Sequence, residues 1–226
     1  MTDVRTENEV KLYADSGPFV FSDDPGPALQ RLRSVIAKEG FRCGGASVRK
    51  HTDTYYADPG DTFADRGIVL RFRDEGMTGY VTVKIPSIRN GMGLSRREVE
   101  TRVINSPGFD RMKALEDHAR NYLGTEDIDP VPRLIAEITR CEFTAESDVR
   151  RYTADFDSVV YVDPRTGARS APVCELEFES LDEAIADDRM MKRLVYRLTE
   201  DYLFDEERMS KYVRGREWIR SLGHDR

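Results

Sequence analysis

The segment DTYYADPGDTFADRGIVLRFR, residues 53–73, contains two strand-like stretches joined by a loop rich in glycine, proline and aspartate. In its last part, IVLRFR, Arg71 and Arg73 alternate with three apolar residues. Because successive side chains of a strand point to opposite faces, both arginines lie on one face and the apolar residues on the other. Guanidinium groups suit phosphate oxygens, so this strand indicates a binding site for a phosphate-bearing ligand.

Four other stretches sort charge onto one strand face in the same way. Their charged faces carry Glu7, Glu9, Lys11, Lys84, Arg96, Glu98, Glu100, Glu175 and Glu177. A charged strand face is most often the solvated side of an antiparallel sheet. Here, however, carboxylates occur in pairs two residues apart, and carboxylate oxygens are the ligands that magnesium and manganese prefer. A closed barrel with these faces turned inward would combine a metal site with a phosphate site.

Apolar spacing and turn residues predict many short strands and a few helices. The predicted strands are 7–14, 46–50, 52–57, 67–74, 79–85, 95–104, 134–146, 149–156, 158–162 and 173–179. The predicted helices are 28–39, 107–123 and 181–204. The charged stretch 205–217 is typical of a solvated surface, and we interpret Trp218 as a packing residue. The pattern predicts one α+β domain over 1–226, with antiparallel strands and helices packed outside.

Composition limits the class of protein. The chain has 226 residues and a net charge of −7. Nucleic acids bind broad basic surfaces, so we expect neither DNA nor another nucleic acid as a partner of this acidic chain. No apolar run approaches the roughly 18 residues that cross a bilayer, and the N-terminus has no apolar signal-peptide core. The three cysteines, Cys43, Cys141 and Cys174, lack C-x-x-C spacing. We expect a cytoplasmic protein with reduced thiols and no membrane partner, and the oligomeric state stays open, with a homodimer among the options.

Ordered motifs carry a resemblance to a known family. The sequence contains E-x-E-x-K at 7–11, D-T-Y-Y at 53–56 and G-x-x-L-R-x-R at 67–73. These are followed by the lysine strand VTVK, then R-x-E-x-E, ITR, A-D-F-D, E-x-E in CELEF and a late S-K-Y. This series resembles the CYTH superfamily, which is named for class IV adenylyl cyclase and thiamine triphosphatase and is also called the triphosphate tunnel metalloenzymes. The resemblance extends from residue 7 to residue 212.

The resemblance implies a closed antiparallel β-barrel of about eight strands that forms a tunnel. It assigns Mg²⁺ or Mn²⁺ to Glu7, Glu9, Glu100, Asp155, Glu175 and Glu177. It assigns a triphosphate to Lys11, Arg71, Arg73, Lys84, Arg140 and Lys211. Lys11, Glu9 and Glu100 are the residues to which it gives catalytic roles. The choices between Asp155 and Asp157 and between Glu98 and Glu100 stay open, as does the role of the connection 16–27.

The implied activity is metal-dependent hydrolysis of a small triphosphate: inorganic triphosphate, thiamine triphosphate or a nucleoside triphosphate. Such chemistry depends on positioning and charge stabilisation more than on covalent catalysis. A class IV adenylyl cyclase is the alternative enzyme, in which a ribose hydroxyl attacks the α-phosphorus and pyrophosphate leaves. A non-catalytic module that binds polyphosphate or nucleotides is the third hypothesis. The carboxylate pairs count against this module, because clustered negative charge hinders simple binding of a polyanion.

Overall fold

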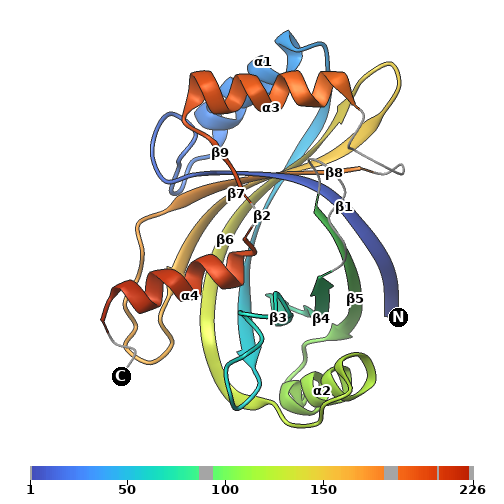
Figure 1. Ribbon diagram of the computed structural model, residues 1–226, viewed down its shortest axis with the longest axis vertical. Helices are drawn as coiled ribbons and strands as arrows, with labels where there is room; N and C mark the ends of the chain where they lie inside the picture. Colours follow the sequence, from blue (N-terminus) through green and yellow to red (C-terminus); the bar gives the residue numbers. More distant parts are fainter. Residues whose placement is uncertain (1, 87–93, 181–187, 208, 224–226) are drawn as a thin grey trace.

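The structure, a computed structural model, describes residues 2–86, 94–180, 188–207 and 209–223. The strands are Thr2–Ala14 (β1), Arg42–Ala57 (β2), Val69–Glu75 (β3), Thr78–Pro86 (β4), Leu94–Ile104 (β5), Asp129–Glu146 (β6), Arg151–Val162 (β7), Val173–Ser180 (β8) and Asp205–Glu206 (β9). The helices are Gly26–Lys38 (α1), Arg111–His118 (α2), Arg189–Tyr202 (α3) and Lys211–Ser221 (α4), with a π-helical segment at Ala119–Leu123 (η1). Figure 1 shows the helices outside one strongly curved sheet.

All strand pairs are antiparallel, and the order in the sheet is β5-β4-β3-β2-β6-β7-β8-β1-β9. Strand β1 has three partners along its length, one of which is the short β9, paired at Leu12 and Tyr13. Its residues 2–9 pair with β5, and its residues 9–14 pair with β8. The predicted α+β class and antiparallel sheet are confirmed.

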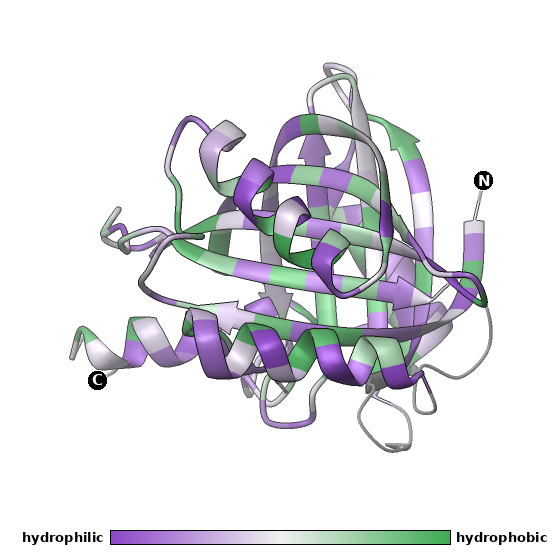
Figure 2. Ribbon diagram, turned by 90° about the horizontal axis from the view of Figure 1, so that it is seen from above, coloured by the Kyte–Doolittle hydropathy of each residue, from purple (hydrophilic) through white to green (hydrophobic). Residues whose placement is uncertain are grey.

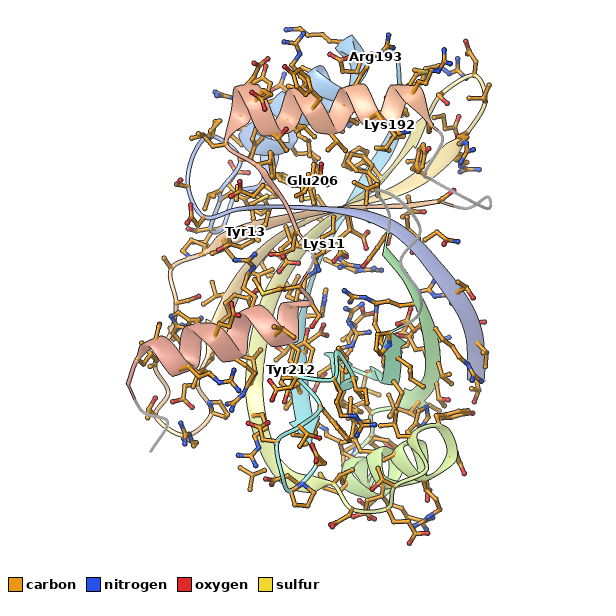
Figure 3. The ribbon with its side chains drawn as sticks, viewed as in Figure 1. Lys11, Tyr13, Lys192, Arg193, Glu206 and Tyr212 are labelled. Carbon is orange, nitrogen blue, oxygen red and sulfur yellow. The ribbon has the colours of Figure 1, made fainter. Side chains whose placement is uncertain are left out.

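The outer face of β1, β6, β7 and β8 packs against α1 and α3. This core includes Leu12, Phe156 and Leu176 from the strands, each fully buried, together with Leu32 and Leu194 from the helices. Alternating hydrophilic and hydrophobic bands along the strands are visible in Figure 2. Helix α3 begins where the side chain of Asp188 accepts hydrogen bonds from two backbone N–H groups of the first turn. Lys192 and Arg193 of α3, labelled in Figure 3, are exposed to solvent.

Helix α4 corrects the interpretation of the stretch 205–217 as solvated surface. It begins after Ser210, whose hydroxyl accepts a hydrogen bond from the N–H of Val213. Two of its charged side chains are neutralised inside the protein: Lys211 pairs with carboxylates of β8, and Arg216 with Asp61. A Cβ at Gly215 would lie 2.3 Å from Leu134 Cδ2, so glycine permits the close approach of α4 to β6.

Two pairs of predicted strands are single strands. Residues 46–57 belong to the uninterrupted β2, and residues 151–162 form the uninterrupted β7, so the strands continue through His51 and Asp157, where separate strands were predicted. Both side chains point inward, where charges from other strands surround them. Helix α3 begins at Arg189, and the predicted start at 181–187 lies outside the described residues. None of the helices in the described ranges is long and apolar enough to cross a bilayer.

Candidate functional site

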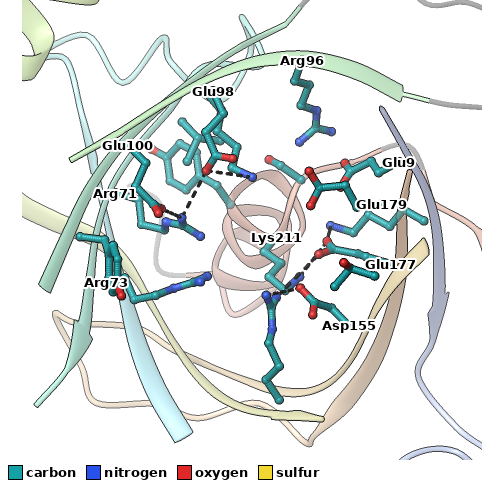
Figure 4. A pocket seen from close by; sticks show the side chains of 18 of the residues that line it. Glu9, Arg71, Arg73, Arg96, Glu98, Glu100, Asp155, Glu177, Glu179 and Lys211 are labelled. Atoms are coloured by element: carbon teal, nitrogen blue, oxygen red, sulfur yellow. Dashed lines mark hydrogen bonds and ion pairs between the residues drawn. The ribbon is translucent and has the colours of Figure 1, made fainter. Parts of the chain in front are cut away.

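The inner face of the sheet encloses a highly charged cavity of about 380 Å³ (Figure 4). Among the described residues, nine cationic and eight carboxylate side chains line it. The cationic residues are Arg5, Lys11, Arg49, Arg71, Arg73, Lys84, Arg96, Arg140 and Lys211. The carboxylates are Glu9, Glu75, Glu98, Glu100, Glu142, Asp155, Glu177 and Glu179. The inward orientation of charge that the period-two pattern predicted is therefore present in most strands.

Arg71 and Arg73 of β3 line the cavity, and both side chains pair with the same buried carboxylate. Asp53, on the neighbouring strand β2, has no exposed surface and lies opposite Arg73 in the strand register. It accepts hydrogen bonds from Arg71 Nη1 at 3.0 Å and from Arg73 Nε and Nη2 at 2.8 and 3.0 Å. Burial alone would raise the pKa of Asp53, but the two guanidinium groups hold it well below its usual range.

Arg140 of β6 is fixed by two aspartates of β7. Its Nε and Nη2 donate to Asp157 at 2.8 and 2.7 Å, and its Nη1 donates to Asp155. Asp157 is fully buried beneath the cavity, whereas Asp155 lines it. Burial, together with the negative charges of neighbouring carboxylates, raises the pKa of Asp155 to about 6. The attraction of Arg140 opposes this rise but does not cancel it.

Two lysines from distant parts of the chain meet at two glutamates of β8. Lys11 Nζ lies 2.8 Å from Glu175 Oε2 and 2.6 Å from Glu177 Oε1. Lys211 Nζ lies 3.0 and 2.9 Å from the same two oxygens. Glu175 also accepts a hydrogen bond from the hydroxyl of Tyr161 at 3.1 Å. Burial opposes ionisation of Glu177, but the two lysines hold its pKa well below its usual range.

The other side of the cavity gathers carboxylates from β1, β5 and β8. Glu9 lies opposite Glu179 in the β1–β8 register. Burial first, and then the charges of Glu98 and Glu9, raise the pKa of Glu179. Glu98 accepts a hydrogen bond from Arg5 at 2.8 Å and lies 3.5 Å from Lys84 Nζ.

Most residues expected at the site lie together. Of the expected metal ligands and phosphate-binding cations, the cavity lining includes Glu9, Lys11, Arg71, Arg73, Lys84, Glu100, Arg140, Asp155, Glu177 and Lys211. Glu175 lies beneath this set, covered by the two lysines. Glu98 and Glu100 both face inward, and Glu100 accepts hydrogen bonds from Arg71 at 3.4 Å and Thr82 at 3.0 Å. The side chain of Glu7 lies outside the described part of the chain.

The sequence analysis missed several charged residues of the cavity, namely Arg5, Arg49, Glu75, Glu142 and Glu179, and it missed the role of the buried Asp53 beneath it. Glu179 continues the face of Glu175 and Glu177 by one further step of two residues, so its position was readable from strand periodicity. Asp53 was visible only as part of a motif. Its role as counterion depends on the pairing of β2 with β3.

The donor chemistry of the cavity fits a divalent metal, although the described residues form no ready-made cluster of three or more His, Cys, Asp or Glu ligands. The carboxylates are instead held by lysines and arginines. The position best suited to a cation is at Glu9 and Glu179, because these two carboxylates lie opposite each other in the strand register and both line the cavity. Hard carboxylate oxygens are the appropriate ligands for Mg²⁺ or Mn²⁺.

Fold and cavity together define an antiparallel sheet that surrounds a site of mixed charge. The CYTH domain matches residues 26–212 of the sequence, so this chain belongs to the CYTH family. The resemblance seen in the ordered motifs is thereby confirmed. A search among curated proteins found no match.

Two solved structures share the fold at low sequence identity. One is HpAC1 from Hippeastrum, described as an adenylyl cyclase candidate with a dominant triphosphatase activity; it has a TM-score of 0.57 and 14% identity, over 94% of this chain and 96% of that one. The other is an adenylate cyclase candidate from Bacillus halodurans, with a TM-score of 0.56 and 14% identity over 93% and 97%. At this identity the comparison bears on the fold.

Proposed function

We propose that this protein is a divalent-metal-dependent triphosphatase that hydrolyses a small triphosphate inside a closed barrel. The pairing of β1 with both β8 and β5 supports the closed barrel. The observation that carries the activity is the cavity of nine cations and eight carboxylates in a chain of net charge −7. A metal–triphosphate complex is the kind of ligand that uses both signs at once, because its phosphates need cations and its metal needs carboxylates.

The cations would bind and orient the phosphate chain. Arg71, Arg73 and Lys84 face the cavity from β3 and β4, and Arg140 faces it from β6. Buried aspartates fix the three arginines, so little side-chain freedom is lost when a phosphate binds. Lys11 and Lys211 would contact the substrate after exchanging part of their pairing with Glu177.

The carboxylates of Glu7, Glu9, Glu100, Asp155, Glu175 and Glu177 remain the expected metal ligands, and Glu179 joins them by its position opposite Glu9. A bound Mg²⁺ or Mn²⁺ would neutralise charge on the phosphate oxygens.

The test is a panel of inorganic triphosphate, thiamine triphosphate and ATP, each with magnesium, with manganese or with excess chelator. We expect phosphate release that requires metal and stops in chelator. Cyclic AMP with pyrophosphate would identify a cyclase instead. Binding without any product would identify a binding module, and full turnover in excess chelator would refute the metal requirement.

A further inference from the structure

Asp53 lies directly beneath the cationic side of the cavity, and it has no place among the proposed substrate contacts. It is completely buried and is not among the residues that line the cavity. Its carboxylate accepts three hydrogen bonds, one from Arg71 and two from Arg73. A buried carboxylate with this many charge-assisted bonds fixes the groups that it holds.

The pairing with Arg73 leaves one particular nitrogen open. Asp53 accepts from both Nε and Nη2 of Arg73, which is a side-on arrangement. Nη1 has no partner among the described residues, and the side chain lines the cavity. Arg140 differs, because all three of its nitrogens donate to Asp155 or Asp157.

The local charge also favours an anion. Arg71 also lies 3.7 Å from Glu98 and 3.4 Å from Glu100, whereas Asp53 is the one carboxylate within 4.0 Å of Arg73 among the described residues. Because Arg73 shares this carboxylate with Arg71, its own positive charge is only partly neutralised. His51 Nε2 lies 3.9 Å from Asp53 Oδ1 and adds no further charge near neutral pH. Burial and the neighbouring Arg73 lower the pKa of His51 to about 3.

We propose that Asp53 is a positioning residue that holds Arg73 side-on, so that Nη1 is presented to a phosphate oxygen of the substrate. This inference rests on the proposed function. Its physical basis is that a free arginine side chain loses rotamer entropy when a ligand immobilises it, whereas an arginine that is already fixed has lost that entropy before binding. Asp53 therefore raises substrate affinity without touching the substrate.

The test measures binding of inorganic triphosphate with magnesium by calorimetry. Asp53→Asn keeps the size of the side chain but replaces one acceptor oxygen with a donor, so Arg73 loses its side-on partner. We expect binding about ten- to a hundred-fold weaker, the value of one charge-assisted hydrogen bond. Asp74→Asn is the matched control, because Asp74 is not among the cavity residues and its Oδ2 lies 3.4 Å from Arg111 Nη2. Loss of this charge is expected to leave triphosphate binding unchanged.

A double-mutant cycle separates positioning from general destabilisation. If Asp53 acts through Arg73, then Asp53→Asn weakens binding much less in an Arg73→Gln background than in the wild type. Equal losses in both backgrounds, or normal binding by Asp53→Asn, would overturn the proposal. Should Asp53→Asn fail to fold, Arg73→Lys decides, because lysine keeps the charge but cannot pair side-on. Binding at the wild-type level by Arg73→Lys would likewise overturn the proposal.

A ligand-free measurement separates this proposal from the proposed function. The Nε–H resonance of Arg73 in the wild-type NMR spectrum is expected to be protected from exchange with solvent, because Asp53 accepts that hydrogen. An unprotected resonance overturns the positioning role even if triphosphate binds. A protected resonance in a protein that binds no triphosphate overturns the proposed function and leaves the geometry of Asp53 intact.

Discussion

Exchanging Glu9 for glutamine and truncating Leu176 to alanine should affect opposite properties of the protein. Glu9 lies on the inner face of β1 and Leu176 on the outer face of β8. Glu9→Gln keeps the volume and removes one negative charge beside Glu179. Leu176→Ala leaves a cavity in the core beneath α1 and α3, where Leu176 has no exposed surface.

The expected magnitudes follow from these surroundings. Relief of like-charge repulsion across a strand pair is worth roughly 0.2–1 kcal/mol, so Glu9→Gln in chelator should be as stable as the wild type or up to about 1 kcal/mol more stable. Truncation of a buried leucine costs roughly 2–5 kcal/mol. For a chain of 226 residues, each kcal/mol shifts the melting temperature by about 2–4 °C. Leu176→Ala should therefore melt roughly 4–20 °C lower.

Two assays are needed. Thermal unfolding in chelator, followed by circular dichroism, measures stability without metal. Phosphate release from inorganic triphosphate with magnesium, measured well below the melting temperature of Leu176→Ala, gives activity. We expect Glu9→Gln to lose at least about tenfold in turnover through one weakened metal contact, and Leu176→Ala to keep near wild-type turnover. An early-melting but active Glu9→Gln, with the reverse for Leu176→Ala, would place the charged face on the outer side of the sheet.

Three further predictions concern single residues. Arg71→Ala should weaken triphosphate binding about ten- to a hundred-fold and also lower the melting temperature, because Asp53 stays buried with one partner fewer; normal values in calorimetry and thermal unfolding would contradict this. The pKa of His51 in the folded protein is about 3, below the 6.5 of an unfolded histidine, so stability is lost as pH falls from 6.5 toward 3. Between pH 6.5 and 5 the contribution of His51 to the free energy of unfolding, measured with urea, should fall by about 2 kcal/mol. The variant His51→Gln should not show this pH-dependent fall. Gly215→Ala should destabilise the protein by up to about 2 kcal/mol, since crowding of roughly 1–3 kcal/mol exceeds the gain of about 1 kcal/mol in helix propensity, whereas Glu217→Ala on the exposed side of α4 should not.

Strand periodicity predicted most of the site because it depends only on neighbouring residues. Arg71 and Arg73 had to share a face whatever their partners were, and so did Glu175 and Glu177. The order of the motifs then identified the family. Local patterns of this kind determine which way a side chain points once a strand forms.

Contacts between distant segments were beyond local patterns. Two strands were predicted on either side of Asp157, yet β7 continues through this residue, where Arg140 and Lys211 from other elements neutralise its charge. Helix α4 was interpreted as solvated surface because its sequence is highly charged. Its docking depends on Gly215 and on partners as remote in the sequence as Asp61.

The pairing of β1 with β5 and β8 bears on where the protein can be cut. The matched family segment begins at residue 26 and ends at 212, so it omits β1 and nearly all of α4. A fragment with those ends would lack Glu9 and Lys11 and would expose the edges of β5 and β8 that β1 covers. Unpaired edges of this kind invite strand addition from other chains. Recombinant fragments trimmed to the family match should therefore aggregate, and the shortest soluble form should keep residues from the start of β1 to the end of α4.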